Sequence, residues 1–242
     1  MITKNQIKLI ISLQQKKNRL EHKLFIAEGE KVIRELLNSE FELSQIFYSE
    51  PIFNDLKSDK QLLISHGDLK KISALTTPNN CLALFKIPLT KPIVSNELIV
   101  VLDDIRDPGN LGTIIRLCDW YGVLQIVCSP ETVDVYNPKV VQATMGSLKR
   151  VQINYTLLEE YLRHCELPVF GTFMDGENIY KTKLPKKAVI IMGNEANGIS
   201  EKLEQFISKK ISIPRFGAIQ KTESLNVASA TAIILSEFLR DF

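Results

Sequence analysis

An asparagine, a glycine and an arginine follow an apolar run near the middle of the chain, in an arrangement that suits chemistry on an oxygen atom. A proline–glycine turn leads to Asn110, which is placed to cap a helix, and Gly112 lets another backbone or a ligand approach closely. Arg116 lies further into an otherwise apolar helix, where a half-sheltered guanidinium would keep its charge and polarise an oxygen. The plainer interpretation is a helix cap and an arginine paired with Asp119, and this motif alone does not exclude it.

A second group of small and acidic residues follows another apolar run, at residues 188–192. Gly193 and Gly198 bracket Glu195, and Ser200 is placed to cap the next helix. Bare backbone at Gly193 suits the flat edge of a ligand, and Glu195 would orient a polar group. The plainer alternative is a turn that carries a solvated glutamate.

A third motif opens the last helix of the chain. A short β-rich run at residues 211–213 leads through an irregular segment to Ser224 and Asn226. A helix N-terminus offers free backbone N–H groups, so we interpret this stretch as half of a cofactor pocket. The plainer alternative is a capping serine and an asparagine bonded locally to the backbone. A Rossmann dinucleotide site is a poor rival, because Gly-x-Gly-x-x-Gly is absent.

The elements that must position these motifs alternate between strand and helix. The unbroken apolar runs are typical of strands covered on both faces, so we predict a parallel sheet flanked by helices. Such sheets bind ligands beyond the carboxyl ends of their strands, where all three motifs fall. The predicted strands span residues 98–102, 124–128, 151–155, 169–173, 188–192 and 211–213, and the predicted helices span 110–121, 138–148, 157–165, 200–206 and 224–239.

The first part of the chain also alternates strands and helices, which predicts a smaller α/β domain. Pro88 and Pro92 mark a linker, so we place one domain at residues 1–90 and the other at residues 91–242. In the first domain, the predicted helices span residues 4–20, 30–37 and 67–75, and the predicted strands span 24–27, 45–48, 61–64 and 81–85.

The 242 residues carry a formal net charge of +2, which decides nothing by itself, but the basic residues are clustered. The clusters lie at residues 1–23, 181–187 and 209–221. Separate basic patches suit a polyanion that touches several surfaces, whereas the plainer interpretation is ordinary solvated lysine.

Four cysteines stand far apart, at positions 81, 118, 128 and 165, without a Cys-x-x-Cys pair. Cys81 and Cys118 lie in apolar or helical contexts, so we expect buried reduced thiols and a cytoplasmic protein. The three histidines are equally scattered, and the sequence indicates no metal site. No run approaches the roughly 20 apolar residues of a membrane span, so we expect no membrane association.

Taken in order, the three motifs resemble those of the SpoU (TrmH-like) family of RNA ribose 2′-O-methyltransferases, within the SPOUT superfamily. The family's Asn-x-Gly-x-x-x-Arg is followed by an aromatic residue, glycine and valine, present here at residues 121–123. Its Gly-x-Glu-x-x-Gly matches residues 193–198. Its Ile-Pro, loop and Ser-Leu-Asn-Val match residues 213–214 and 224–227. The resemblance covers roughly residues 96–242.

The first ninety residues resemble the family's small substrate-binding domain, which has a ribosomal-protein-like α/β fold. Residues 25–29 and 76–78 carry this weaker match. The chain departs from the family in two places: the loop between Ile213 and Ser224 is longer, and Ala228 stands where a serine is common.

The resemblance implies a C-terminal trefoil knot that holds S-adenosylmethionine, a homodimer with sites at the subunit interface, and no metal. Arg116 is then expected to approach the ribose 2′-hydroxyl or the adjacent phosphate. The residues expected to position this arginine, the ribose and the methionine end of the cofactor are Asn110, Glu195, Ser224 and Asn226. The expected cofactor-binding residues are Thr172, Gly193, Asn194, Gly198, Ile213 and Leu225.

We therefore predict an S-adenosylmethionine-dependent RNA 2′-O-methyltransferase. Ribosomal RNA is favoured over tRNA as the substrate, because the additional basic N-terminal domain would supply RNA affinity and recognise shape. The alternative from another class is an RNA-binding protein that keeps the fold without activity. The intact Arg116, Glu195 and Asn226 argue against that alternative.

Overall fold

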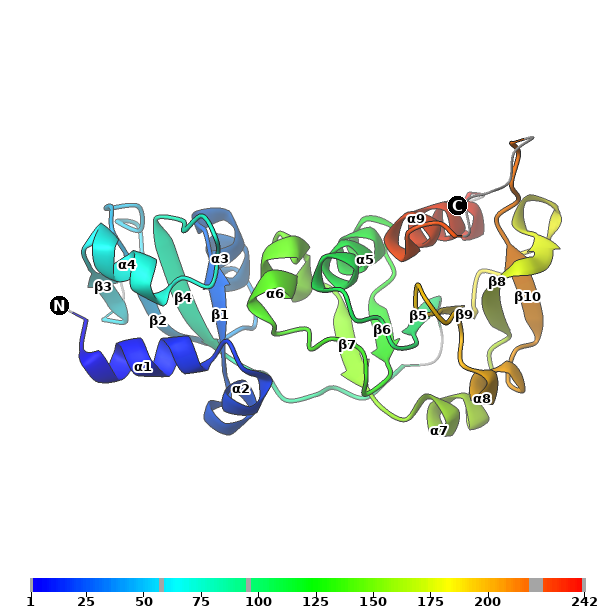
Figure 1. Cartoon of the computed structure of the whole chain (residues 1–242), viewed down its shortest axis with the longest axis horizontal. Coiled ribbons are helices and arrows are strands. Elements are labelled where there is room, and N and C mark those ends of the chain that lie inside the picture. Colours follow the sequence, from blue (N-terminus) through cyan, green and yellow to red (C-terminus); the bar gives the residue numbers. More distant parts are fainter. Residues whose placement is uncertain (1, 57–58, 95–96, 218–223, 241–242) are drawn as a thin grey trace. The chain divides into compact units, whose positions relative to one another are not determined.

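The computed structural model describes residues 2–56, 59–94, 97–217 and 224–240, and it contains two compact units (Figure 1). The first unit comprises Met1–Leu89 and Asp134–Lys149, and the second comprises Thr90–Val133 and Arg150–Phe242. The sequence division at residues 90 and 91 placed the segment Asp134–Lys149 in the second domain, whereas the structure groups it with the first. The physical reason is aromatic packing, because the ring of Tyr136 lies 4.8 Å from that of Phe25 in the first unit.

The first unit is built on a four-stranded mixed sheet with the strand order β1-β4-β2-β3. Strand β4 pairs antiparallel with β1 and β2, and β2 pairs parallel with β3. Its elements are α1 (Lys4–Ser12), α2 (Lys16–His22), β1 (Leu24–Glu28), α3 (Glu30–Leu37), β2 (Leu43–Tyr48), β3 (Gln61–Leu63), α4 (His66–Ile72), β4 (Cys81–Lys86), α6 (Pro138–Thr144) and the 3-10 turn η1 (Ser147–Lys149). The prediction of a smaller N-terminal α/β domain is confirmed.

The single helix predicted over residues 4–20 is wrong, because the chain forms two helices with a break between them. Two side chains of α2 satisfy the carbonyl groups that the break leaves free. Arg19 donates to the carbonyl oxygens of Leu13 and Gln14 over 2.8 and 2.9 Å, and Asn18 donates to that of Ser12 over 2.9 Å. Arg19 is itself buried, with 2% exposure, and pairs with Asp134 at 2.5 Å.

The second unit is built on a six-stranded, fully parallel sheet with the strand order β10-β8-β9-β5-β6-β7. This confirms the predicted parallel α/β fold. Its elements are β5 (Ile99–Leu102), α5 (Pro108–Trp120), β6 (Gln125–Cys128), β7 (Gln152–Tyr155), α7 (Leu158–Arg163), β8 (Val169–Asn178), the 3-10 turn η2 (Ile179–Lys181), β9 (Val189–Met192), α8 (Glu201–Glu204), β10 (Lys209–Ser212) and α9 (Val227–Phe238).

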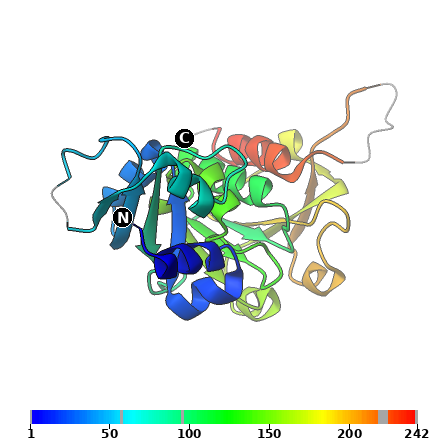
Figure 2. The ribbon, with the colours of Figure 1, turned by 60° about the vertical axis from the view of Figure 1, so that its left-hand side comes forward.

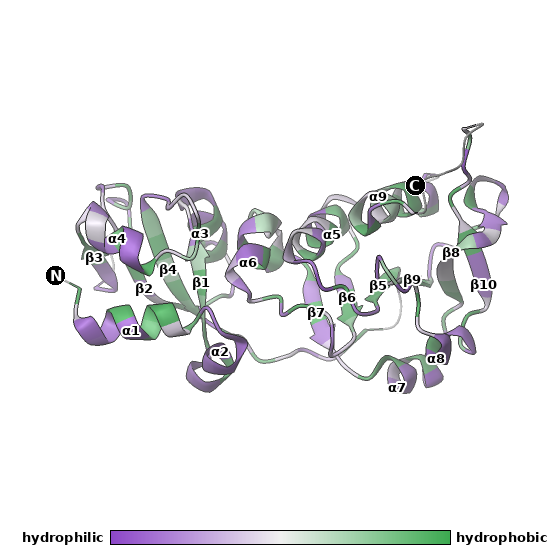
Figure 3. Ribbon diagram, viewed as in Figure 1, coloured by the Kyte–Doolittle hydropathy of each residue, from purple (hydrophilic) through white to green (hydrophobic). Residues whose placement is uncertain are grey.

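Burial explains why the central strands are unbroken apolar runs. Every residue of β5 and β9 is buried, and β5 is green in Figure 3, whereas the edge strand β7 is mostly purple and only partly buried. Side chains of α7 and α8 pack on one face of the sheet. Helices α5 and α9 pack together and lie on the other face (Figures 1 and 2). The sheet is therefore covered on both sides, as parallel sheets require.

Strand β8 is longer than the predicted run of residues 169–173. Its pairing with β10 is interrupted by a bulge and then continues. Gly171 pairs with Lys210 of β10, and the next pair is Glu177 with Ile211, so five residues of β8 bulge out between them. A side chain at Gly176 would meet the backbone of Ile211 at 2.5 Å, which explains the glycine there. The bulge carries residues 172–174 to the pocket described below.

Among the described residues, no helix has the length and apolar character needed to cross a membrane. Cys81 and Cys118 are buried, as predicted, and so is Cys128. Burial raises the pKa of the Cys81 thiol to about 12, so this thiol is protonated and unreactive at neutral pH.

Candidate active site

Three side chains from the three sequence motifs meet in one hydrogen-bonded network. The amide nitrogen of Asn110 on α5 donates to a carboxylate oxygen of Glu195 over 2.5 Å. The amide nitrogen of Asn226, before α9, donates to the amide oxygen of Asn110 over 2.8 Å. Residues that are 85 and 116 positions apart in the sequence are thus joined through the two ends of one amide group.

Asn110 is available for this network because it does not cap its helix. The cap is Asp107, whose carboxylate accepts the backbone N–H of Asn110 over 2.8 Å, and α5 begins at Pro108. The predicted capping role of Asn110 is therefore wrong. A carboxylate at the cap and a proline in the first turn suit a helix N-terminus, and they leave the Asn110 side chain free to reach Glu195.

Arg116 follows on the exposed side of α5, and no partner of its guanidinium appears among the described residues. The plainer interpretation paired it with Asp119. Instead, Asp119 accepts hydrogen bonds from Arg150 over 2.7 and 2.8 Å. The prediction that the guanidinium of Arg116 is half-sheltered is also wrong, because the Arg116 side chain is exposed in this structure. Its charge is therefore available to an external group.

Asn226 caps α9 and serves the network at the same time. Its amide oxygen accepts the backbone N–H groups of Ala228 and Ser229 over 3.0 and 3.2 Å, while its amide nitrogen reaches Asn110. Both ends of the amide have partners, which fixes its orientation. The predicted local bonding of Asn226 to the backbone is confirmed, and its predicted role in positioning the reactants stays a prediction. Ser224 is exposed two residues earlier.

The loop after β9 is closed by its own backbone. Asn194 and Gly198 exchange two backbone hydrogen bonds, of 3.0 and 2.8 Å. A side chain at Gly193 would meet the backbone carbon of Gly198 at 2.3 Å, so Gly193 permits this close contact. The missing side chain of Gly193 thus leaves room for the loop, and the predicted contact of its backbone with a ligand edge stays a prediction, since Gly193 also lines the pocket described below. Gly198 has a φ of +69°, the left-handed region that favours glycine.

Two aspartates that the sequence analysis did not select hold the same loop against the end of β5. Asp103 is 5% exposed and accepts the N–H and the hydroxyl of Ser200 over 2.8 and 2.7 Å. Ser200 therefore precedes α8 without capping it through its hydroxyl. The side-chain amide of Asn194 donates to the backbone oxygen of Asp104 over 2.7 Å. The carboxylate of Asp103 directly after a buried strand was the sequence signal for its bonds to Ser200, whereas the contact through the backbone oxygen of Asp104 had none.

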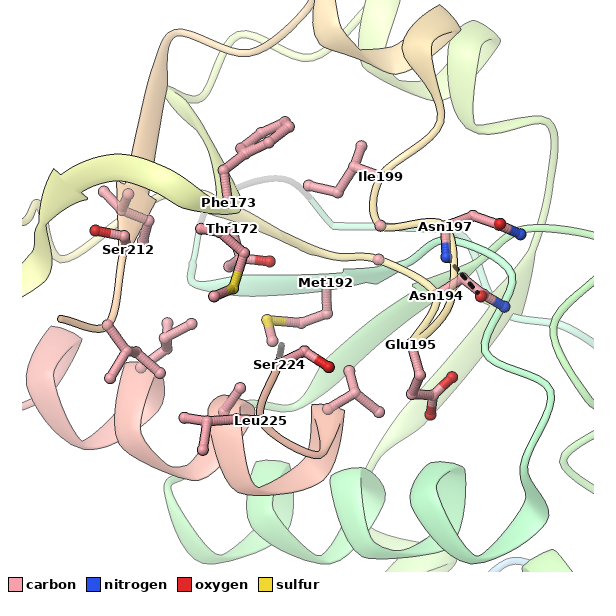
Figure 4. Close-up of a pocket in the computed structure, with 18 of the residues that line it drawn as sticks. Thr172, Phe173, Met192, Asn194, Glu195, Asn197, Ile199, Ser212, Ser224 and Leu225 are labelled. Atoms are coloured by element: carbon pink, nitrogen blue, oxygen red, sulfur yellow. Dashed lines mark hydrogen bonds between the residues drawn. The ribbon is translucent and has the colours of Figure 1, made fainter. Parts of the chain in front are cut away.

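A pocket of about 690 Å³ opens beside the network, at the carboxyl ends of β9 and β10 and the bulge of β8. In Figure 4, Glu195 extends from the loop after β9 toward the start of α9. All six residues predicted to bind the cofactor line the pocket, namely Thr172, Gly193, Asn194, Gly198, Ile213 and Leu225. Of the residues predicted to act in catalysis, Glu195 and Ser224 line it, whereas Asn110, Arg116 and Asn226 do not.

The walls of the pocket suit a small organic molecule that has both polar and apolar parts. Apolar side chains come from Met192, Leu225, Val227 and Ile234, and polar ones come from Glu195 and Ser224. The hydroxyl of Thr172 is bound to the neighbouring strand β9, since it donates to the carbonyl oxygen of Ile191 over 3.0 Å. Volumes of roughly 300–1,000 Å³ with mostly apolar walls and a few polar groups are typical of cofactor sites. Within the described part of the chain, no cluster of three or more metal-ligating side chains occurs.

The predicted basic clusters differ in the burial and the ion pairing of their side chains. Lys209 and Lys210 pair with Glu177 and Glu204, at 2.9 and 2.6 Å, so much of the third cluster is neutralised. Lys221 of that cluster lies outside the described residues. The second cluster keeps exposed lysines, namely Lys181, Lys183, Lys186 and Lys187. Arg19 of the first cluster is buried and contributes nothing to a basic surface.

Together, the parallel sheet, the pocket at its carboxyl edge and the adjacent amide–carboxylate network define an α/β enzyme that uses a small-molecule cofactor. The chain belongs to the SpoU rRNA Methylase family, whose sequence profile matches residues 97–236. A second profile, the MRM3-like substrate binding domain, matches residues 4–83. The chain is thus an RNA methyltransferase.

Individual relatives cover nearly the whole chain. A protein of the TrmH family from Porphyromonas gingivalis has a TM-score of 0.91 and 35% identity, covering 100% of both chains. An AdoMet-bound rRNA methyltransferase from Sinorhizobium meliloti has a TM-score of 0.88 and 30% identity, covering 99% of this chain and 96% of its own. The 23S rRNA (guanosine(2553)-2′-O)-methyltransferase RlmP of Bacillus subtilis is 29% identical over 231 residues, which are 92% of this chain and 91% of its own.

Proposed function

We propose that this protein transfers a methyl group from S-adenosylmethionine to a ribose 2′-hydroxyl of 23S ribosomal RNA. The observation that carries the proposal is the network of Asn226, Asn110 and Glu195 at the edge of the cofactor-sized pocket. The names of relatives support the substrate, because RlmP of B. subtilis acts on a guanosine 2′-oxygen of 23S rRNA. The AdoMet-bound S. meliloti structure supports the cofactor.

The residues that would hold S-adenosylmethionine are those of the pocket wall. Leu225 and Met192 offer apolar surface, and the backbone at Gly193 and Ile213 offers hydrogen-bonding groups. When bound, S-adenosylmethionine supplies a methyl group that its sulfonium charge has already activated. The trefoil knot that the family resemblance predicts around this pocket stays a prediction.

The chain's own contribution is to the other reactant, since a ribose 2′-hydroxyl is a weak nucleophile. We assign Arg116 to the 2′-hydroxyl or the neighbouring phosphate, where its exposed charge lowers the cost of developing negative charge on oxygen. We assign Asn110, Glu195 and Asn226 to positioning the reactants. Their mutual bonds keep these side chains in one arrangement, which is what orientation effects in catalysis require. Ser224, exposed on the pocket wall, is assigned to the same positioning group.

We further propose that the first unit binds RNA, because residues 4–83 match a substrate-binding domain. The protein would act as a homodimer, as the family resemblance implies. It would work in the cytoplasm, where a bacterial-type ribosomal RNA is found.

The test is methyl transfer from radiolabelled S-adenosylmethionine to three RNAs in parallel: protein-free 23S rRNA, 16S rRNA and bulk tRNA. We expect label in 23S rRNA, in a nuclease-resistant dinucleotide that identifies a 2′-O-methyl group. Label mainly in tRNA would replace the substrate by the alternative considered above. Cofactor binding without transfer to any of the three RNAs would favour an RNA-binding protein that keeps the fold without activity.

A further inference from the structure

The only tryptophan of the chain, Trp120, is 83% exposed at the end of α5. Single exposed leucines or valines are ordinary on protein surfaces. A tryptophan, in contrast, is highly buried on average, because its ring is the largest apolar surface that a side chain offers. The position of Trp120 therefore needs an explanation that packing does not supply.

Trp120 shares one face of α5 with Arg116. Residues four apart lie on the same side of a helix, separated by about 6 Å along the axis at 1.5 Å per residue. Thr113, three residues before Arg116, is also exposed, whereas Ile114 and Ile115 are buried. Helical side chains tilt toward the N-terminus, so the indole leans toward the turn that carries Arg116.

The backbone beneath the indole is held on both sides. Asp119 and Arg150 form an ion pair next to it, with hydrogen bonds of 2.7, 2.9 and 2.8 Å. The helix then ends through Gly122, which has a φ of +72°, and the N–H of Val123 donates to the carbonyl oxygen of Cys118 over 2.8 Å. An aromatic ring on a rigid stretch of backbone loses little conformational entropy when it binds a ligand. Such a ring suits a stacking surface.

We infer that Trp120 stacks on an RNA base next to the nucleotide whose ribose is methylated; this inference rests on the proposed function. Stacked nucleotides advance about 3.4 Å each, so the offset from Arg116 corresponds to one or two nucleotides. RNA-binding proteins hold unstacked bases on aromatic side chains. Trp120 would thereby set the register of the strand while Arg116 meets the target ribose.

The charges around Trp120 favour RNA over a second protein. The carboxylate nearest in sequence, Asp119, is already bound by Arg150, so it does not repel phosphate. The other fully exposed members of this helix face are the polar Thr113 and the cationic Arg116, and the apolar Leu117 between them and Trp120 is only partly exposed, whereas a protein partner would be matched by further exposed apolar residues. The contrary feature is Leu124, which is also exposed, and the test below therefore includes self-association.

The first test uses the intrinsic fluorescence of the 242-residue chain, in which Trp120 is the only tryptophan. Protein-free 23S rRNA is titrated into the protein. We expect stacking to quench the emission, with the same Kd that anisotropy of labelled RNA reports. RNA binding with unchanged emission would overturn the inference.

The second test compares Trp120→Ala, Trp120→Phe and the matched control Leu157→Ala, which removes another exposed apolar side chain of this unit. We expect Trp120→Ala to raise the Kd for 23S rRNA about 5- to 100-fold, the range for losing one stacked base. Trp120→Phe should restore most of the affinity, and Leu157→Ala should leave it unchanged. Melting temperature and S-adenosylmethionine affinity should match the wild type in all three variants.

Two results would contradict the inference. One is an unchanged RNA affinity in Trp120→Ala. The other is a change of wild-type emission with protein concentration in the absence of RNA, together with dissociation of Trp120→Ala into monomers, which would make Trp120 a subunit contact. Failure of the proposed function can be told apart from failure of this inference. It would appear as an absence of methyl transfer already in the wild-type protein, before any change at Trp120.

Discussion

The side-chain amide of Asn110 donates to Glu195 over 2.5 Å and accepts from Asn226 over 2.8 Å, so a single asparagine joins the first turn of α5, the loop after β9 and the N-terminus of α9. Because its two ends have different partners, the orientation of this amide is determined by the network. The three residues are 85 and 116 positions apart, so no short sequence window contains this relationship.

Replacing Asn110 by alanine removes both bonds at once. We expect Asn110→Ala to lower kcat for methyl transfer by about 10- to 100-fold, because small losses of orientation are costly in catalysis. The affinity for S-adenosylmethionine should change little, since Asn110 does not line the pocket. Single-turnover methylation and calorimetry measure the two quantities separately.

The same network makes a second variant informative. Asn226 and Asn110 act through one chain of hydrogen bonds. The kcat of the double variant Asn110→Ala/Asn226→Ala should therefore be close to that of whichever single variant has the lower kcat. Rate losses that multiply would contradict a shared positioning role. Circular dichroism of each variant checks that α9, which Asn226 caps, is still formed.

Removing the charge of Arg116 should stop the chemistry without loosening the cofactor. We expect Arg116→Ala to lower kcat by about 100-fold or more, the range for deleting a group that stabilises charge in a transition state. S-adenosylmethionine should bind Arg116→Ala with nearly wild-type affinity. Arg163→Ala, which removes another exposed arginine of the same unit, is the matched control and should be fully active. Joint loss of methylation and cofactor binding in Arg116→Ala would remove the assigned role.

The two glycines of the loop after β9 should respond differently to alanine. In Gly193→Ala, the new methyl group would lie 2.3 Å from the backbone of Gly198, so the loop has to move. In Gly198→Ala the methyl group meets no atom within 4 Å, and the cost is about 1–2 kcal/mol for the left-handed backbone. We expect Gly193→Ala to lose most of its S-adenosylmethionine affinity and Gly198→Ala to keep more of it. Calorimetry showing equal losses would contradict this account of the loop.

Burial of Glu28 in the first unit should make stability depend on pH. Glu28 is 4% exposed, and this burial raises the pKa of its carboxyl above 4.5, although hydrogen bonds from Ser73 and Ala74 partly oppose the shift. The protonated form is therefore favoured by folding. Its stabilising contribution is fully present below the unfolded pKa and is lost as pH rises through the folded pKa.

The measurement compares the unfolding free energy of the wild type with that of Glu28→Gln between pH 4 and 8. We expect the wild type to lose stability relative to Glu28→Gln as pH rises. Asp68→Asn is a control of opposite sign and is followed to below pH 3.8, because Lys71 lowers the pKa of Asp68. The wild type should keep a constant advantage over this variant above pH 3.8 and lose it as pH falls below that value. A Glu28→Gln difference that does not change with pH would contradict the buried-carboxyl account.

The pattern of the sequence was sufficient for the architecture because it reflects burial. The runs 98–102 and 188–192 became the buried central strands β5 and β9, and α3 has the predicted bounds. The pocket residues were predicted from the family resemblance, and the parallel topology explains why they meet at one edge of the sheet. In contrast, the bulge of β8 depends on its pairing with β10, a partner that lies far along the chain.

The errors concern groups whose partners are distant in sequence. Local spacing suggested that Asn110 caps α5 and that Arg116 pairs with Asp119, but Asp107 is the better cap and Arg150 reaches Asp119 from 31 residues away. The packing of Asp134–Lys149 with the first unit likewise depends on residues that lie far from it in the sequence. Helical periodicity indicates that a face is buried, but it does not indicate against which element.

The central claim is tested most directly by mass spectrometry of 2′-O-methylated nucleotides in 23S rRNA. The rRNA is taken from cells that carry the wild-type gene, a deletion, or the Arg116→Ala variant at equal protein level. The account predicts one 2′-O-methyl nucleotide that is present with the wild type and absent from the other two strains. An identical set of 2′-O-methyl nucleotides in all three strains would contradict it.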